Sequence, residues 1–176
     1  MNRQELRFSG SGGQGVILAT VIMAEAAVIA GKYTAQSQSY GPEARGGSCK
    51  AECIISEEQI HFTKVTHPTF LMALTQKALD DYAKGLPKET VVLMDDSLAA
   101  PECLRDNKVV SLPILKTAKV TVGKAFTANI VAVGAVNKLL GIVSPEEIRK
   151  AVLLHIPAGT EEINMKALEE GEKLIK

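Results

Sequence analysis

The sequence predicts a single α/β domain over residues 1–176, in which a mostly parallel sheet lies between helices and carries one antiparallel hairpin. Three observations indicate this class. Strand-like segments alternate with helical segments along the chain, and no internal repeat or low-complexity linker divides it. Hydrophobic residues make up 46% and charged residues 23% of the composition, the balance of a folded domain.

The first predicted unit is a strand, a glycine loop and a helix. The strand-like segment 5–9 leads into four glycines, Gly10, Gly12, Gly13 and Gly15. The apolar run 16–30 then ends at Gly31, a residue type common just after a helix. Thr20 and Glu25 interrupt this run, which is shorter than the roughly 20 residues of a membrane crossing, so we expect a buried helix.

The middle of the chain predicts further strands and one helix. A second strand is expected at 33–37, followed by the irregular segment SYGPEARGG. The alternating segment 49–55 and the segment 60–65 predict an antiparallel hairpin. Apolar residues at helical spacing predict a helix over 68–86, and a buried strand over 90–94 follows.

Asp95 and Asp96 follow that strand, where an open α/β sheet presents side chains to a ligand, although Asp96 and Ser97 are at least as suited to capping the next short helix. Another strand is predicted at 108–112. The remainder is mostly helical, with one helix over 128–140 and another opened by Ser144, Pro145 and Glu147, which make a capping pattern. An amphipathic helix begins at Thr160.

Composition excludes several function classes. Twenty basic residues balance twenty acidic ones, and aromatic residues make up 4%, so neither a nucleic acid nor an anionic membrane is an expected partner. The N-terminus has no export pattern, and three cysteines cannot pair completely, which together predict a cytoplasmic protein with reduced thiols. Cys49 and Cys53 share one strand face, and burial explains them better than a metal site.

The glycine loop carries the strongest functional signal. Gly10, Gly12 and Gly15 have GxGxxG spacing directly between a strand and a helix, the context of phosphate binding. Glycines let a pyrophosphate approach the backbone, and the helix start supplies free N–H groups and the positive end of its dipole. Close packing of strand and helix is the alternative reading, and the ligand reading is favoured.

Three other residues are candidates for the same site. Arg45 and the following Gly46 place a guanidinium in a segment that can approach a phosphate, but Arg45 could equally pin its own loop. Asn129 could donate to a ligand, although capping of the helix near Ile130 is the favoured reading. No carboxylate follows the second predicted strand to hold a ribose, which argues against NAD.

No catalytic or metal-binding set is predicted. His61, His67 and His155 share neither helical nor metal-ligand spacing, and each is better explained as a surface or core residue. A phosphate cradle without a catalytic set indicates that the chain is one part of a larger assembly.

The segments GSGGQGV, SYGPEARGG and FTANIVAVGAVNKLLG, in this order, resemble the gamma subunits of 2-oxoacid:ferredoxin oxidoreductases over nearly the whole chain. The form YGPEARGG is more similar to the 2-oxoglutarate branch than to the pyruvate branch, which reads closer to FGPERRGAP. The resemblance implies the fold of the third domain of single-chain pyruvate:ferredoxin oxidoreductases. It also implies a complex that decarboxylates a 2-oxoacid on thiamine diphosphate and transfers the acyl group to coenzyme A while reducing ferredoxin.

In the related single-chain enzymes this domain holds coenzyme A, and the positions that match are Gly12, Gly13, Gln14 and Gly15, then Arg45 and Asn129. The match at Arg45 is loose, because the single-chain enzymes resemble lysine there. Thiamine diphosphate, magnesium and iron-sulfur clusters are expected on partner alpha, beta and delta subunits, so the chain alone is expected to be inactive. The alternatives are a gamma subunit for pyruvate, a branched-chain oxoacid or indolepyruvate, and a free-standing NAD-sensing module.

Overall fold

The computed structural model describes residues 3–40 and 48–176. Its centre is a six-stranded sheet with the order β2-β3-β1-β4-β5-β6. The strands are β1 (Arg3–Ser11), β2 (Tyr33–Tyr40), β3 (Ser48–Ser56), β4 (Phe70–Ala73), β5 (Val91–Asp95) and β6 (Lys108–Leu112). Strands β1, β4, β5 and β6 run parallel, whereas β3 runs antiparallel to both β1 and β2. The predicted mixed α/β sheet is therefore confirmed.

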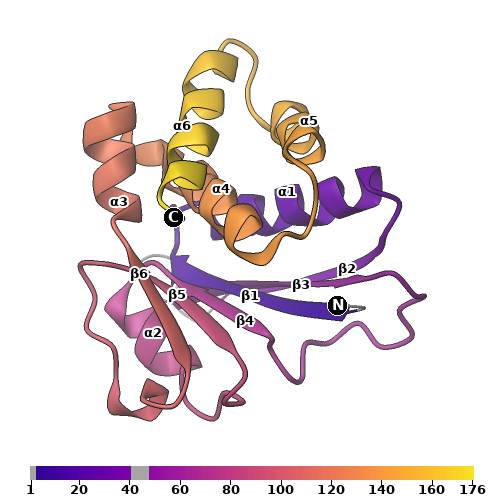
Figure 1. Cartoon of the computed structure of the whole chain (residues 1–176), viewed down its shortest axis with the longest axis vertical. Coiled ribbons are helices and arrows are strands. Elements are labelled where there is room, and N and C mark those ends of the chain that lie inside the picture. The colour runs from indigo at the N-terminus through magenta and orange to yellow at the C-terminus, as the bar shows by residue number, and fades with distance from the viewer. Residues whose placement is uncertain (1–2, 41–47) are drawn as a thin grey trace.

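Helices cover the sheet unequally. They are α1 (Val16–Ile29), α2 (Gln76–Tyr82), α3 (Ile114–Lys116), α4 (Ala128–Leu140), α5 (Pro145–His155) and α6 (Glu161–Lys173). Two 3-10 turns, η1 (Glu102–Leu104) and η3 (Ala125–Thr127), and a π-helical segment, η2 (Thr117–Val122), complete them. Helices α1, α4, α5 and α6 lie on one side of the sheet and α2 on the other (Figure 1).

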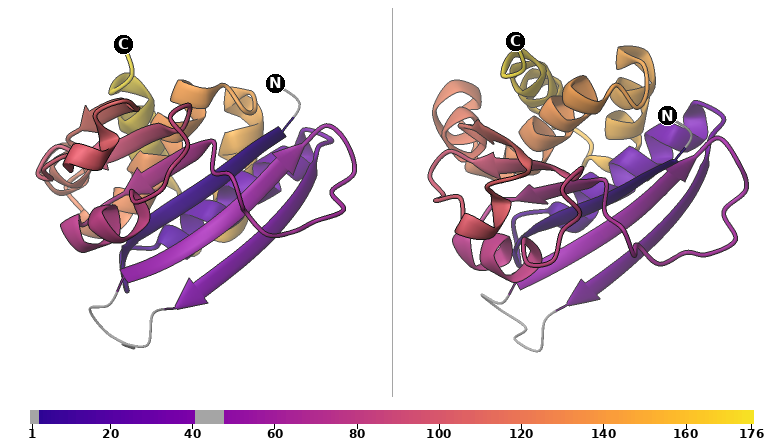
Figure 2. Two further views of the ribbon diagram at one scale, coloured as in Figure 1. Left: turned by 90° about the horizontal axis from the view of Figure 1, so that it is seen from below. Right: turned by 60° about the horizontal axis from the view of Figure 1, so that its bottom comes forward.

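The apolar core has two parts, one on each face of the sheet. The larger apolar cluster joins one face of the sheet to α1, α4, α5 and α6, and includes Leu6, Phe8 and Phe70. The smaller cluster packs α2 and η1 on the opposite face, where Leu71 and Val92 are buried. Seen from that face, the strands run side by side with β2 at one edge (Figure 2). Strand β1 is flanked by β3 and β4, so its carboxyl end, which leads into the glycine loop, belongs to an inner strand rather than an edge strand.

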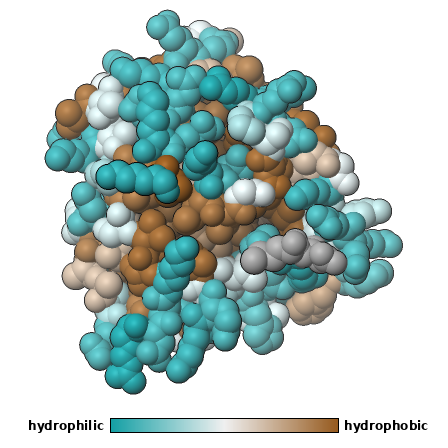
Figure 3. Space-filling model, viewed as in Figure 1, coloured by the Kyte–Doolittle hydropathy of each residue, from teal (hydrophilic) through white to brown (hydrophobic). Residues whose placement is uncertain are grey.

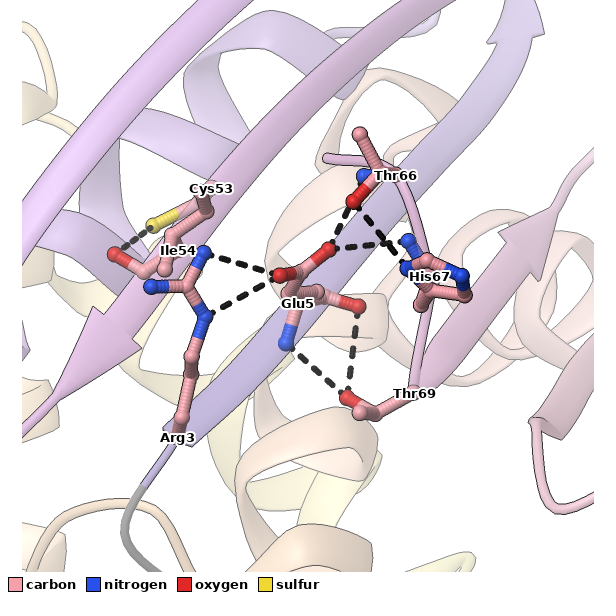
Figure 4. A network of polar contacts seen from close by, with 7 residues as sticks. All are labelled: Arg3, Glu5, Cys53, Ile54, Thr66, His67 and Thr69. Atoms are coloured by element: carbon pink, nitrogen blue, oxygen red, sulfur yellow. Dashed lines mark hydrogen bonds and ion pairs between the residues drawn. The ribbon is translucent and has the colours of Figure 1, made fainter. Parts of the chain in front are cut away.

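The predicted hairpin was assigned to the wrong partner. Strand β3 pairs antiparallel with β2 and β1, and residues 57–69 form no strand. Both edges of β3 are taken, by β1 and β2, so segment 60–65 has no place beside it. Just beyond that segment the buried Glu5 carboxylate holds the chain, because its Oε2 accepts the backbone N–H groups of Thr66 and His67 at 3.0 and 3.1 Å (Figure 4). Its Oε1 accepts from the Arg3 guanidinium at 2.9 Å. These backbone donors therefore serve a side chain rather than a sheet ladder.

The helix expected over 68–86 is also wrong in its first half. Residues Phe70–Ala73 form β4, all four of them buried, and only Gln76–Tyr82 are helical. A short apolar run suits a strand buried on both faces as well as a helix, because periodicity does not separate the two. Thr75 sets the turn between β4 and α2, because its Oγ1 accepts the N–H of Ala78 at 3.3 Å and caps α2.

The helical end of the chain agrees with the sequence prediction. Helix α4 occupies 128–140 and ends at Gly141, with φ 60°. Ser144 and Glu147 form the expected capping box at the start of α5, with Pro145 as the first helical residue. Helix α6 follows Thr160, whose side chain makes no cap hydrogen bond.

Candidate functional site

The glycine loop is a tight turn at the carboxyl end of β1. The N–H of Gln14 donates to the carbonyl of Ser11 at 3.2 Å, and Gln14 Oε1 accepts the N–H of Ser11 at 2.7 Å. Gly13 has φ 90°, in the left-handed region that this turn requires. Gln14 therefore holds the loop from inside, and its carboxamide oxygen lies 2.5 Å from the position that a Cβ at Gly10 would take.

One side of this loop is open. Gly12 and Gly13 are exposed, and a Cβ added at either would meet no atom within 4 Å. Gly12 has no positive φ, so the backbone itself does not require glycine there. The loop leads directly into α1, whose first turn has N–H groups without helical partners. An anion placed on the open side would meet these donors and the positive end of the α1 dipole.

Asn129 closes the other side of the loop. It is 5% exposed, and its Nδ2 lies 3.5 Å from the carbonyl oxygen of Gly15. A Cβ on Gly15, which has φ 71°, would stand 2.6 Å from that nitrogen. The structure thus brings Asn129 to the glycine loop across 114 positions of sequence.

The favoured capping role of Asn129 was wrong. The N-cap of α4 is Thr127, whose side chain makes no cap hydrogen bond, and Asn129 lies inside the first turn. Its Oδ1 accepts the N–H of Ile130 at 3.0 Å, while the amide faces Gly15. The starts of α1 and α4 therefore meet at one point, as the resemblance implied by giving Asn129 and the glycine loop one ligand.

Arg45 and Gly46 lie outside the described residues. The strand ends on either side of their segment are placed, however. In the sheet register Tyr40 faces Cys49, and Cys49 in turn faces Gly10 at the end of β1. The described residues on either side of segment 41–47 therefore lie at the same end of the strands as the glycine loop.

Asp95 has a structural role at the carboxyl end of β5, the same end of the sheet as the glycine loop. It is 1% exposed, and its Oδ1 accepts both the N–H and the hydroxyl of Ser97, while Oδ2 accepts the N–H of Leu115 at 2.8 Å. These bonds fold the turn after β5 and hold the start of α3. The expected presentation of Asp95 to a ligand is therefore not observed. The alternative cap is not observed either, because Asp96 is exposed and η1 begins after Pro101.

A charged cluster on the α2 face was missed by sequence reasoning. Glu52, 8% exposed, accepts from Arg7 Nε at 2.6 Å and lies 3.4 Å from Lys50 Nζ. Both cations also stand over the ring of Tyr82, at 5.9 and 5.7 Å from its centroid. The alternation of β1 and β3 could have placed these groups on one face, but only their pairing shows that they meet.

Two of the three cysteines are buried, and Cys103 is exposed. Cys49 and Cys53 are buried, as expected, and burial raises the pKa of the Cys53 thiol to about 12. Among residues 3–40 and 48–176 no group of three or more His, Cys, Asp or Glu side chains could hold a metal ion. Nor does any helix in this part of the chain have the length and apolar character to cross a membrane.

A separate hollow lies at the opposite end of the strands. It has a volume of about 640 Å³ and is lined by the first residues of β1 and β5 and the last turn of α4, including Pro68, Val91 and Leu139. Apolar side chains gather between the helical layer and the sheet on the face in Figure 3. Because the glycine loop lies at the carboxyl end of β1, this hollow is not part of the candidate site.

Comparison with known proteins assigns the family. Residues 5–174 match the sequence model of the pyruvate ferredoxin/flavodoxin oxidoreductase family. The 2-oxoglutarate synthase subunit KorC of Methanocaldococcus jannaschii is 42% identical over 99% of this chain and 95% of its own length. The crystal structure of a keto/oxoacid ferredoxin oxidoreductase gamma subunit from Geobacter sulfurreducens is 45% identical, covers 99% of this chain and 97% of that chain, and has a TM-score of 0.87.

A more distant structure has the same fold. The 2-oxoglutarate:ferredoxin oxidoreductase of Magnetococcus marinus, solved with 2-oxoglutarate, coenzyme A and succinyl-CoA bound, matches with a TM-score of 0.88 at 20% identity. The match covers 99% of this chain and 31% of that longer chain. The chain therefore belongs to the pyruvate ferredoxin/flavodoxin oxidoreductase family, and the resemblance to its gamma subunits that the sequence indicated is confirmed.

Proposed function

We propose that this chain is the gamma subunit of a 2-oxoglutarate:ferredoxin oxidoreductase complex and that it holds coenzyme A during formation of succinyl-CoA. The observation that carries the proposal is the open side of the glycine loop, where Gly12 and Gly13 leave free space in front of the first turn of α1. A pyrophosphate is the part of coenzyme A that suits this space, because it is anionic and compact.

Each candidate residue has a distinct role in binding coenzyme A. Gly12, Gly13 and Gly15 let the pyrophosphate approach the backbone, and Gln14 holds the turn in shape through its bond to Ser11. Asn129 fixes the loop against the start of α4 and brings a second helix N-terminus to the same point. Arg45, with Gly46 beside it, adds a guanidinium that pairs with a phosphate oxygen.

The chemistry of the oxoacid takes place on partner subunits. Decarboxylation requires thiamine diphosphate, and electron transfer requires iron-sulfur clusters, which we assign to the alpha, beta and delta chains. The contribution of this chain is to position the thiol of coenzyme A for acyl transfer, so it has no activity alone. The choice of 2-oxoglutarate is supported by the KorC relative, which is 42% identical.

The test is Gly12→Ala in the reassembled complex. In the free chain the added methyl group meets nothing within 4 Å and Gly12 has no positive φ, so the thermal stability should not change. If a pyrophosphate occupies that space, the methyl group displaces it and the KM for coenzyme A should rise about tenfold or more, as for the loss of one charge-assisted contact.

One control and two refuting outcomes accompany this variant. Formation of the thiamine radical intermediate from 2-oxoglutarate without coenzyme A should be unchanged, because decarboxylation precedes acyl transfer. A preference for pyruvate or a branched-chain oxoacid would refute the assignment of substrate. An unchanged KM for coenzyme A in a correctly assembled complex would refute the loop as its pyrophosphate site.

A further inference from the structure

The two edge strands of the sheet differ in how well they are protected. In the order β2-β3-β1-β4-β5-β6 the outer strands are β2 and β6, and each has one side without a pairing strand among the described residues. Such a side presents backbone N–H and C=O groups that can pair with a strand of another chain. Proteins usually prevent this with charged side chains, a proline, a bulge or a very short strand.

Strand β6 has several of these protective features. It is five residues long and begins at the exposed Lys108. Its last residue is followed directly by Pro113, which has no backbone N–H to donate. We therefore do not expect β6 to pair with another chain.

Strand β2 has none of them. It is eight residues long, reads YTAQSQSY and contains neither a charged residue nor a proline. Its register with β3 runs without interruption from the pair Tyr33 and Ser56 to the pair Tyr40 and Cys49, so it has no bulge. No strand that the structure describes pairs with its outer side, and β2 lies at the margin of the sheet in both views of Figure 2.

The side chains at this edge are also accessible. Gln36, Gln38 and Ser39 are exposed. Tyr33, the first residue of β2, and Val28, in the last turn of α1, are each 52% exposed. The edge therefore combines unpaired backbone groups with two large apolar side chains at one corner, and both features favour contact with another protein surface.

The charge of the chain favours a second copy of itself as the partner. Strand β2 is uncharged, and the whole chain has 20 acidic and 20 basic residues, so two copies approach without net repulsion. A two-fold axis at the middle of β2 makes the two strands antiparallel, and two-fold dimers are the commonest symmetric oligomers. Because β6 is protected, the assembly ends at two chains.

We propose that β2 is a self-association surface, at which the β2 strands of two copies pair antiparallel and join the two six-stranded sheets into one continuous sheet. Neither the glycine loop nor Asn129 belongs to β2, and β3 lies between β2 and the strand that carries the loop. The contact therefore does not depend on the binding of coenzyme A, and its test needs no coenzyme.

The experiment measures the mass of the purified chain by sedimentation equilibrium over a range of concentrations. The wild-type chain, 18.8 kDa as a monomer, should form a dimer. Gln36 is exposed near the middle of β2, so the two-fold axis brings its two copies close together. Gln36→Lys and Gln36→Glu should each raise the Kd of the dimer about tenfold or more, because like charges then meet across the contact. An equimolar mixture of the two variants should restore association, since a lysine then meets a glutamate.

The other edge of the sheet supplies the matched control. Ser111→Lys adds the same charge at an exposed position of β6, so the Kd of the dimer should not change. Amide hydrogen exchange of the wild-type chain tests the same contact without any substitution. Exchange in residues 33–40 should slow as the concentration of the chain rises, whereas exchange in residues 108–112 should not.

Three results would overturn the proposal. They are a wild-type chain that stays monomeric with exchange in residues 33–40 independent of concentration, a dimer that Gln36→Lys and Gln36→Glu leave intact, and folded variants whose mixture does not associate. If the wild-type chain is monomeric and Gln36→Lys instead prevents co-elution with partner subunits, the edge receives a strand of a different protein. Failure of the proposed function looks different, because it appears in the KM of the Gly12→Ala complex for coenzyme A and not in the mass of the purified chain.

Discussion

The contact between Gly15 and Asn129 allows a quantitative test of the site. Gly15→Ala adds one methyl group at φ 71°, where an L-residue costs about 1–2 kcal/mol relative to glycine. The new Cβ would also stand 2.6, 2.9 and 3.1 Å from Nδ2, Cγ and Cβ of Asn129. Asn129 is buried in the first turn of α4, so it cannot swing into solvent, and such overpacking adds about 1–3 kcal/mol.

The expected loss of unfolding free energy is therefore about 2–5 kcal/mol, measured by urea denaturation of the purified chain. Gly13→Ala is the matched control, because φ is 90° there but no atom lies within 4 Å of the added Cβ. It should show only the conformational cost of about 1–2 kcal/mol.

A double-mutant cycle tests whether Asn129 is the residue that the methyl group of Gly15→Ala meets. Combining Gly15→Ala with Asn129→Ala removes the two closest contacts, at Nδ2 and Cγ, so the double variant should lose less stability than the sum of the single variants. The reasoning is refuted if Gly15→Ala destabilises no more than Gly13→Ala, or if the two substitutions are additive.

Three further predictions concern other parts of the chain. Gly134→Ala should destabilise the chain although alanine favours helices, because its Cβ would overlap the carbonyl oxygen of Leu168 where α4 crosses α6; thermal unfolding checks this against Gly12→Ala. Burial raises the pKa of Cys53 from 9.0 to about 12, so the unfolded state releases this proton first and stability should fall between pH 9.0 and about 12. The fall should be shallower in Cys53→Ala, by up to about 1.4 kcal/mol per pH unit, in urea titrations at each pH. Arg45→Ala should raise the KM for coenzyme A about tenfold to a hundredfold in the assembled complex without affecting the thiamine radical, and an unchanged KM would leave Arg45 as a loop or interface residue.

Local signals sufficed for elements with strong boundaries. Gly31 and Gly141, both with positive φ, end helices where the sequence placed the ends, and the Ser144 capping box opens α5 as predicted. Local signals failed where a contact between residues far apart in the sequence decides the backbone conformation. Segment 60–65 alternates like a strand, yet the Glu5 carboxylate takes the N–H groups of Thr66 and His67 just beyond it.

The sequence by itself determined the glycine loop and its helix, because a turn at positive φ and an apolar helix depend mainly on neighbouring residues. It also determined the family, through motifs that span the chain. Only the tertiary structure decided that Asn129 supports this loop rather than capping its own helix, and that Asp95 holds α3 rather than facing a ligand. The physical reason is that an amide or a carboxylate bonds equally well to its own backbone, to a distant segment or to a ligand. Which partner it takes depends on packing between elements that lie far apart in the sequence.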